Sequence, residues 1–583
     1  MGDRFFCRLK HGLVGSVALV ALVGCSSVGA GNNPVNTNFL DEGGTSPAIS
    51  DTISGQYLAG RQALRERDSR AAWEYFQKAY EADPEDDLLL QNTFQAALEN
   101  GQLSDAIKLA AMIEQKNLSA IETARLLLAV EDIRLANYDS AIQRLNTLER
   151  DRFNIVLKPV LTAWALVGQG DFNAAKASLD TLDEYKGFYI LKSYHLALLA
   201  DAAGQVEVAK EAYETALKGP SGRAVRLIQS YGAFLAANGA QDDALKLFKN
   251  YQANFPLSPT ILDLVATLEA GQELKPLINS PIQGAAEALY SSASIVSQQQ
   301  INSLAITLAH LSLLLRPDLT PSHILLAEIA EDRRQYDQAR DYYRLIPAKS
   351  PYAENAEIRI AWLSYRLGER DQAITKLENL IQKDPRNIEP LIVLADLSRD
   401  GKDWARAAKN YGKAIDNIGA AKGRLWSLHY ARGISYERLG AWSKAEADLK
   451  KALELRPDNP QILNYLGYSW VDRNENLEEA KSLLIKAVSL RPEDGYIVDS
   501  LGWLYYRLND FENAVQQLER AAELQPEDPT INDHLGDVYW QVGRYEEARY
   551  QWQRALWLEP EEDQIPIIKQ KLKDGLPVGD SVK

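Results

Sequence analysis

The sequence predicts an all-α fold in which antiparallel helix pairs stack side by side into a solenoid. Three features of the 583-residue chain predict it: an alanine that recurs at a nearly constant step, a small residue twelve positions before many of these alanines, and a proline twelve positions after many of them. A fixed repeat of about 20 to 50 residues is typical of architectures in which each unit buries its apolar surface against its neighbours. We therefore expect a quasi-one-dimensional superhelix.

The recurring alanine sets the length of one unit at 34 or 35 residues, which is the usual step. Its members are Ala72, Ala106, Ala141, Ala175, Ala209, Ala244, Ala305, Ala339, Ala373, Ala407, Ala445, Ala480, Ala514 and Ala548. In several units an aromatic residue stands three positions earlier, where two helices would turn: Phe172, Tyr336, Trp404, Trp442, Phe511 and Tyr545. These recurrences predict about 14 units.

Small residues and prolines define the two helices of each unit. The small residues twelve positions before the alanine are Gly60, Ala129, Ala163, Ala197, Gly232, Ala293, Ala327, Ala361, Ala395, Gly433, Gly502 and Gly536. The prolines twelve positions after it are Pro84, Pro256, Pro317, Pro351, Pro385, Pro457, Pro492, Pro526 and Pro560. Small residues on facing helices let the backbones approach closely, and proline ends the second helix because it lacks an N–H donor and clashes with the preceding turn.

One unit shows the whole pattern clearly. It reads Asp-Ser-Leu-Gly-Trp-Leu-Tyr-Tyr at residues 499–506 and Asp-Phe-Glu-Asn-Ala at 510–514, and it ends before Pro526. This pattern resembles the tetratricopeptide repeat, and the resemblance extends over nearly all of the chain after residue 55. It implies a superhelix of about 14 helix pairs whose first helices line a concave face.

The first 24 residues are predicted to be a secretory signal. Basic residues precede an apolar run at residues 12–23, which is too short to cross a membrane because a span needs about 20 apolar residues. The run closes on Leu-Val-Gly-Cys at residues 22–25, which resembles the lipobox of bacterial lipoproteins. The resemblance implies that Cys25 is lipidated and anchors the chain, and the following Ser26 implies the periplasmic side of the outer membrane.

Alternatively, Cys25 is an ordinary small residue beside a cleavage site, but the mature chain would then carry an unpaired thiol in an oxidising compartment. Cys7 and Cys25 are the two cysteines of the chain, which excludes a disulfide framework or a cysteine-based zinc site. Residues 26–55 are rich in Gly, Asn, Ser, Thr and Pro, which predicts a flexible tether after the anchor.

The repeats are predicted to form two arms, an N-terminal one over 56–256 and a C-terminal one over 282–560. The step from Ala244 to Ala305 is 61 residues, and prolines interrupt the stretch 257–281, so we expect an irregular, degenerate unit there. Residues 561–583 follow the last repeat. We expect a capping helix and a tail, with Lys569, Lys571 and Lys573 on the outer side of that helix.

Composition and motifs argue against catalysis and against nucleic acid. The formal net charge is -16, and phosphate backbones require clustered Lys and Arg. HExxH, GxSxG and GxxxxGK[ST] motifs are absent, and the six histidines are scattered, which fits satisfied structural histidines better than a metal site. We therefore expect no enzyme activity, no catalytic residues, no metal and no cofactor. A hydrolase hidden in the irregular stretch 257–300 is the alternative.

Binding of other proteins is the class of function that these observations leave open. The first helices of the C-terminal half carry residues suited to it. Aromatic and arginine anchors dominate protein interfaces, and the acidic residues among them would favour a basic partner. The candidate residues on the concave face are Trp362, Tyr365, Arg366, Tyr496, Asp499, Trp503, Tyr506, Arg507, Asp533, Asp537 and Trp540. The alternative is that several of these rings pack between repeats. A Lys and Asn set for clamping a terminal carboxylate is not apparent.

The segment 464–556 carries a closer resemblance. Its Asn-Tyr-Leu-Gly-Tyr at 464–468, its 499–508 segment and its His-Leu-Gly-Asp-Val-Tyr-Trp at 534–540 resemble a proteobacterial group of large repeat lipoproteins. The resemblance implies an outer-membrane adaptor that assembles a carboxyl-terminal processing, or tail-specific, protease with peptidoglycan hydrolases as substrates. The alternative is a scaffold of a secretion, pilus or exopolysaccharide machine, since similar anchored repeats serve there.

Overall fold

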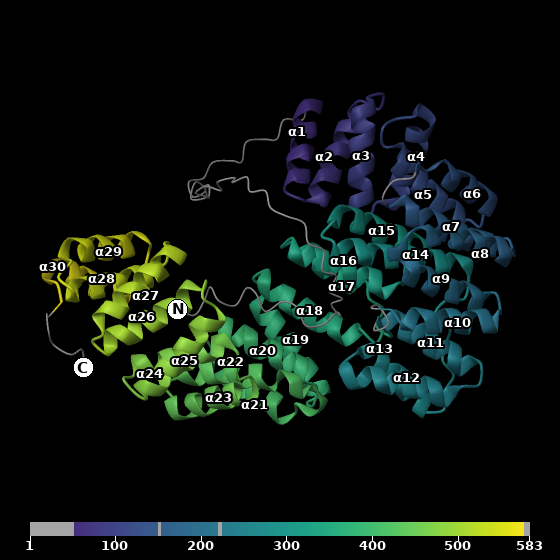
Figure 1. The fold of residues 1–583 in the computed structure, drawn as a ribbon. Helices are drawn as coiled ribbons and strands as arrows, with labels where there is room; N and C mark the ends of the chain where they lie inside the picture. The colour runs from purple at the N-terminus through teal and green to yellow at the C-terminus, as the bar shows by residue number, and fades with distance from the viewer. Residues whose placement is uncertain (1–51, 150–152, 220–223, 577–583) are drawn as a thin grey trace. The chain divides into compact units, whose positions relative to one another are not determined.

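The computed structural model describes residues 52–149, 153–219 and 224–576. Helices make up nearly all of these residues, and no strand occurs among them. The predicted all-α solenoid of helix pairs is therefore confirmed for this part of the chain (Figure 1). The predicted signal, the predicted lipidation site Cys25 and the predicted tether up to residue 51 lie outside the described residues.

The chain divides into two compact units between Ala373 and Ile374, inside helix α19 (Arg370–Lys383). We refer to the described residues before this point as the N-terminal unit and to those after it as the C-terminal unit. The stretch 257–281, where the sequence predicts an irregular unit, lies within the N-terminal unit rather than at the division.

The N-terminal unit contains six helix pairs, then a lone helix, then two further pairs and α18. Its helices are α1 (Ile53–Arg65), α2 (Ser69–Ala82), α3 (Asp87–Glu99), α4 (Leu103–Lys116), α5 (Ile121–Arg134), α6 (Tyr138–Thr147), α7 (Asn154–Gly168), α8 (Phe172–Asp180), η1 (Thr181–Glu184), η2 (Lys186–Phe188), α9 (Tyr189–Ala202), α10 (Val206–Leu217), α11 (Val225–Ala237), α12 (Gln241–Asn254), α13 (Pro259–Glu269), α14 (Pro281–Gln298), α15 (Asn302–Leu315), α16 (Thr320–Asp332), α17 (Tyr336–Arg344) and α18 (Ala353–Arg366). The lone helix is α13, and residues 270–280 after it form no regular element.

The C-terminal unit continues the same arrangement. Its helices after α19 are α20 (Ile388–Asp400), α21 (Trp404–Asp416), η4 (Gly419–Arg424), α22 (Leu425–Arg438), α23 (Trp442–Leu455), α24 (Pro460–Asp472), α25 (Leu477–Leu490), α26 (Gly495–Arg507), α27 (Phe511–Leu524), α28 (Pro529–Gln541), α29 (Tyr545–Trp557) and α30 (Gln564–Asp574). In each pair the helix that comes first along the chain is called the first helix below.

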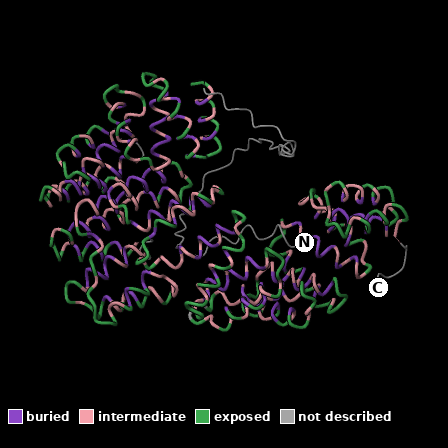
Figure 2. Tube along the Cα trace, turned by 180° about the vertical axis from the view of Figure 1, so that it is seen from behind, coloured by how far each residue is buried: buried purple, intermediate pink, exposed green. Residues whose placement is uncertain are grey.

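The repeat pattern follows from burial between the two helices of a pair. Every recurring alanine, from Ala72 to Ala548, is fully buried. The small residue twelve positions earlier faces the second helix: a Cβ at Gly232 would come within 2.1 Å of the Phe248 ring. Figure 2 shows buried residues along the inner sides of the helices throughout both units. Close backbone contact at these small residues is therefore what fixes the period.

Helices α14 and α15 pack against the first helices of the N-terminal unit. Helix α14 contacts α7 and α9, and α15 contacts α3 and α5. Gly284 of α14 lies on the indole of Trp164, where a Cβ would come within 2.2 Å of the ring. The buried Glu287 carboxylate of α14 pairs with Arg226 of α11 and accepts a hydrogen bond from the Tyr194 hydroxyl. The first helices α3, α5, α7 and α9 are thus covered by α14 and α15.

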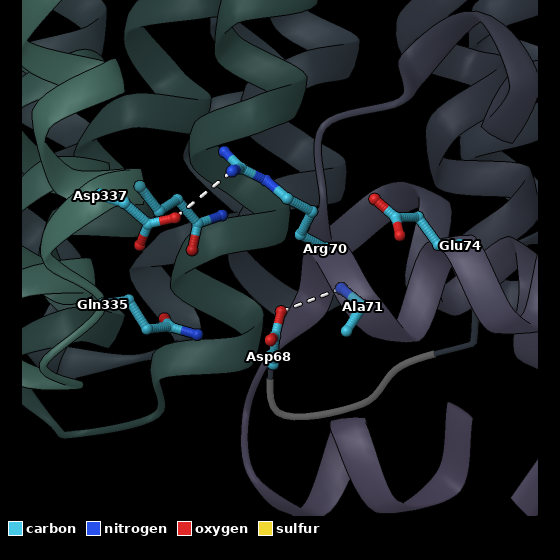
Figure 3. Close-up of a pocket in the computed structure, with 7 residues that line it drawn as sticks. Asp68, Arg70, Ala71, Glu74, Gln335 and Asp337 are labelled. Atoms are coloured by element: carbon cyan, nitrogen blue, oxygen red, sulfur yellow. Dashed lines mark hydrogen bonds and ion pairs between the residues drawn. The ribbon is translucent and has the colours of Figure 1, made fainter. Parts of the chain in front are cut away.

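The two ends of the N-terminal unit also meet. Arg70 on α2 pairs with Asp337 at 3.3 Å and with Asp341 at 3.0 Å on α17. His310 of α15 lies 2.9 Å from the carbonyl oxygen of Leu98. Figure 3 shows the polar recess at this junction, which Asp68, Arg70, Ala71, Glu74, Gln335, Asp337 and Gln338 line. The Asp68 side chain there accepts a hydrogen bond from the Ala71 N–H and so caps α2.

Candidate protein-binding face

The candidate binding residues of the C-terminal unit lie on its first helices, which are α20, α22, α24, α26 and α28. We call the surface that α22, α24 and α26 form the first-helix face. On α26, Tyr496, Asp499, Trp503, Tyr506 and Arg507 share one side of the helix, because side chains three or four positions apart stack along it. Tyr496, Trp503 and Arg507 are half-buried, and Asp499 and Tyr506 are buried.

Trp503 is held in a stack of three rings. Its indole lies 4.7 Å from the Tyr506 ring with an angle of 11° between the planes, and 4.1 Å from the His534 ring with an angle of 14°. The fully buried Asp499 carboxylate lies 2.9 Å from His534 Nδ1. Burial alone would lower the pKa of His534, but the Asp499 carboxylate, together with those of Asp533 and Asp537, outweighs burial and the pKa is raised. The stack joins α26 to α28.

Tyr468 of α24 lies at the middle of the first-helix face. It follows its small residue Gly467 just as Trp503 follows Gly502, and it is half-buried. Burial raises the pKa of Tyr468, and the carboxylates of Asp499 and Asp472 raise it further. Asp472 is exposed. A half-exposed ring therefore stands beside several carboxylates here.

The candidate residues of the last repeat are engaged within the chain. The Lys571 ammonium of α30 lies 2.7 Å from Asp533 and 2.8 Å from Asp537. Trp540 Nε1 donates a hydrogen bond to the Leu576 carbonyl at 2.7 Å, and all three α28 side chains are buried. The expectation that Lys571 lies on the outer side of the capping helix is wrong, because the two carboxylates draw its ammonium inward.

Trp362, Tyr365 and Arg366 belong to α18 in the N-terminal unit. The Trp362 ring meets the Tyr336 ring edge-on at 5.9 Å, and the Arg366 guanidinium lies 5.8 Å from the Trp362 ring centre. Tyr365 is buried, whereas Arg366 is exposed. Counted from the small residue of each repeat, Ala361 or Gly502, these three residues occupy the same positions on α18 as Trp503, Tyr506 and Arg507 occupy on α26.

Sequence reasoning did not include Tyr468, Asp472 and His534 among the candidates. The signal for Tyr468 was available, because it stands 35 residues before Trp503 and so occupies the same position in its repeat. His534 had no such signal, since its role depends on the ring and the carboxylate that α26 presents to it. Binding of a partner by any of these residues stays a prediction.

In the part of the chain that the structure describes, no group of three or more His, Cys, Asp or Glu side chains is arranged to hold a metal ion. Within the same residues, each helix is too short or too polar to cross a membrane.

Comparison with known families and proteins identifies the repeats. Residues 356–387, 426–459 and 500–557 each match a model described as tetratricopeptide repeat. The chain is similar to the TPR repeat-containing protein PA4667 of Pseudomonas aeruginosa, with 28% identity over 34% of this chain and 33% of that protein. It is also similar to the lipoprotein NlpI homolog of Haemophilus influenzae, with 49% identity over 7% of this chain and 13% of that protein. The matches thus span a third or less of these relatives.

Among solved structures, the chain is similar to the APC/C hetero-tetramer Cut9-Hcn1, at 16% identity and a TM-score of 0.37. That match covers 90% of this chain and 96% of the other. A tetratricopeptide repeat protein from Parabacteroides merdae matches at 17% identity and a TM-score of 0.35, over 44% of this chain and 97% of the other.

Proposed function

We propose, from the premise that this chain is built of tetratricopeptide repeats, that it is a non-catalytic scaffold that binds other proteins on the first-helix face of its C-terminal unit. One observation carries the choice of that unit. In the N-terminal unit α14 and α15 cover the first helices α3, α5, α7 and α9, whereas on the C-terminal unit half-buried Tyr468, Tyr496 and Trp503 line first helices α24 and α26. Aromatic side chains of this kind are common anchors of protein interfaces.

The proposal includes a membrane anchor. The Leu-Val-Gly-Cys ending at residues 22–25 supports lipidation of Cys25, and the name of the Haemophilus influenzae relative, a lipoprotein, agrees with it. Ser26 after the cysteine supports attachment to the periplasmic side of the bacterial outer membrane. The anchored chain would hold its partners close to the membrane surface.

The finer form of the proposal concerns the partners. The 464–556 segment resembles LbcA, an outer-membrane lipoprotein partner of the carboxyl-terminal processing protease CtpA. By that resemblance the chain would assemble a tail-specific protease with peptidoglycan hydrolases and so limit cleavage of the cell wall. The second candidate is a scaffold of a secretion, pilus or exopolysaccharide machine, which the same anchor and repeats would suit.

Pull-down from a periplasmic extract tests the proposal. The immobilised mature chain should retain a tail-specific protease and murein endopeptidases, whereas envelope machine components would support the second candidate. Tyr496→Ala together with Arg507→Ala should reduce capture at least fivefold while circular dichroism stays unchanged. The matched control is Lys486→Ala on second helix α25, where the ammonium pairs with Asp458 in the turn that precedes α24. Equal loss with both variants, or no capture by the wild-type chain, would contradict the proposal.

A separate incubation tests the non-catalytic part. Purified chain mixed with peptidoglycan should release no soluble muropeptides. Their release would show an enzyme, and the irregular stretch 257–300 would then be the first place to examine.

A further inference from the structure

Helix α29 carries most of the exposed aromatic side chains of the described chain. Four aromatic side chains are exposed among the described residues, and three of them, Tyr545, Tyr550 and Trp557, belong to α29. Tyr550 is 57% exposed and Trp557 is 69% exposed. These two residues are seven positions apart, which is about two helical turns, so their side chains project from the same side of the helix. We call this side of α29 the end face.

The end face departs from the repeat pattern. Tyr550 and Trp557 stand two and nine positions after the recurring Ala548, and these two positions are also exposed in the second helices α21, α23, α25 and α27. The residues at these positions are small or polar in the four other helices: Lys409 and Asp416, Ala447 and Glu454, Ser482 and Ser489, and Gln516 and Glu523. A repeat therefore packs without large rings here. Exposed apolar patches on a folded chain mark interaction sites.

The chain beside the end face is acidic. Residues 558–563 join α29 to α30 and read Leu-Glu-Pro-Glu-Glu-Asp, with no basic residue among them. Their four acidic side chains are exposed. Glu546, one turn before Tyr550, is also exposed. Carboxylates thus stand at both ends of the two rings.

The two arginines of α29 are held against the preceding helix and its turn. The Arg549 guanidinium lies 5.1 Å from the centre of the Trp540 ring of α28. Arg554 donates a hydrogen bond to the Pro526 carbonyl at 2.9 Å, in the turn before α28. Both arginines are half-buried. The solvent side of α29 therefore combines uncovered rings with negative charge.

We propose that the end face docks a basic polypeptide segment of a partner protein. Apolar side chains of that segment cover Tyr550 and Trp557, and its basic groups meet the carboxylates of residues 558–563. Arginine suits this surface, because its guanidinium stacks on an exposed indole and also pairs with a carboxylate. A second copy of this chain, with its net charge of -16, would be repelled from the end face, and so would an anionic lipid surface.

This inference goes beyond the proposed function, because it assigns a second docking surface to the chain. The end face lies on a second helix, whereas the first-helix face is formed by α22, α24 and α26. A chain with both surfaces could hold two different proteins at the same time. Each surface can be removed by its own substitutions, so the two are tested separately.

A labelled helical peptide tests the inference. The probe is a polyalanine peptide with leucine and arginine placed three and four residues apart, and its control has glutamate in place of arginine. Fluorescence anisotropy with the mature full chain should detect the arginine peptide and not the glutamate peptide. Tyr550→Ser together with Trp557→Ser should weaken binding at least tenfold while circular dichroism stays unchanged, because both side chains are exposed. Leu490→Ser, which removes a 44% exposed apolar side chain from α25, is the matched control and should leave binding unchanged.

The charge requirement is tested on the same peptide. Glu559→Gln, Glu562→Gln and Asp563→Asn combined should weaken binding about tenfold, since charge-assisted contacts are lost. The chain with Tyr496→Ala and Arg507→Ala should bind the arginine peptide as the wild type does. Peptide binding that this chain loses would place the peptide on the first-helix face and would overturn the inference.

Other outcomes would also overturn it. These are equal binding of the two peptides, no binding of the arginine peptide, and equal effects of Leu490→Ser and of the Tyr550→Ser, Trp557→Ser pair. Dimers of the chain alone in analytical ultracentrifugation that Trp557→Ser abolishes would show that a second copy occupies the end face. Binding to phosphatidylglycerol vesicles that Trp557→Ser abolishes would show a lipid surface instead.

Discussion

The indole of Trp503 lies in a near-parallel stack on the imidazole of His534, with ring centroids 4.1 Å apart. Trp503 belongs to first helix α26, and His534 belongs to first helix α28. A residue that the sequence places on a binding face therefore also joins two consecutive repeats. Any substitution of Trp503 acts on the stability of the C-terminal unit as well as on binding.

Replacement of Trp503 by alanine should destabilise the contact between α26 and α28. The loss of a half-buried indole stacked on two rings should cost about 2 kcal/mol of unfolding free energy. Hydrogen exchange of the α28 amides, followed by mass spectrometry, measures the change. Trp503→Phe should recover part of it, because a smaller ring can still stack. Unchanged exchange of α28 in Trp503→Ala would show that the stack contributes nothing to the packing.

The charge of His534 gives the C-terminal unit a pH dependence of known sign. Because the folded pKa of His534 is raised by Asp499 above its unfolded value of about 6.5, the stabilisation is complete below that value. It is lost as pH rises through the folded pKa. Thermal unfolding at a series of pH values, compared with that of His534→Gln, should isolate this contribution. A difference between the two chains that grows with rising pH would contradict the assignment.

Lys571 should be far more important to stability than its neighbours on α30. Removal of its ammonium in Lys571→Ala leaves the buried Asp533 and Asp537 carboxylates without their cation, which should cost roughly 3 kcal/mol. Lys569→Ala is the matched control, because Lys569 is exposed on the same helix and its loss should cost less than about 0.5 kcal/mol. Hydrogen exchange of α28 and α30 measures both. Equal effects of the two variants would contradict the structure around Lys571.

Gly284 should be essential for the contact between α14 and α7. A Cβ at this position would overlap the Trp164 indole, so Gly284→Ala should destabilise the N-terminal unit by about 2 to 3 kcal/mol. Gly187→Ala in the same unit is the control, because no atom lies within 4 Å of the added Cβ. Denaturant unfolding followed by tryptophan fluorescence compares them. A Gly284→Ala chain as stable as the control would mean that α14 does not lie on Trp164.

The repeat period was predictable because it depends on contacts within one pair of helices. An alanine such as Ala445 and a glycine such as Gly433 meet inside their own pair, twelve residues apart, so a single sequence records the constraint. The fold of each unit, its turns and the buried alanines follow from such local contacts. The candidate residues on α26 were also predictable, since they share one side of a single helix.

Contacts between distant repeats could not be predicted from the spacing of residues in the same way. Helices α14 and α15 have the same small-residue pattern as the other pairs, so nothing in their spacing indicated that they pack on α3, α5, α7 and α9. Glu287 and Arg226 are 61 residues apart, and neither residue type alone predicts a buried pair. The position of Lys571 was missed for the same reason. It depends on two carboxylates in another helix, which a helical pattern within α30 does not contain.

The central claim is that polypeptide partners bind the first helices of the C-terminal unit because α3, α5, α7 and α9 of the N-terminal unit are covered by α14 and α15. Hydrogen exchange of the mature full chain, alone and saturated with a captured partner, tests it most directly. The account predicts new protection in α22, α24 and α26 and no change in α3, α5, α7 and α9. New protection confined to α3, α5, α7 and α9, or fast exchange of α14 in the chain alone, would contradict it.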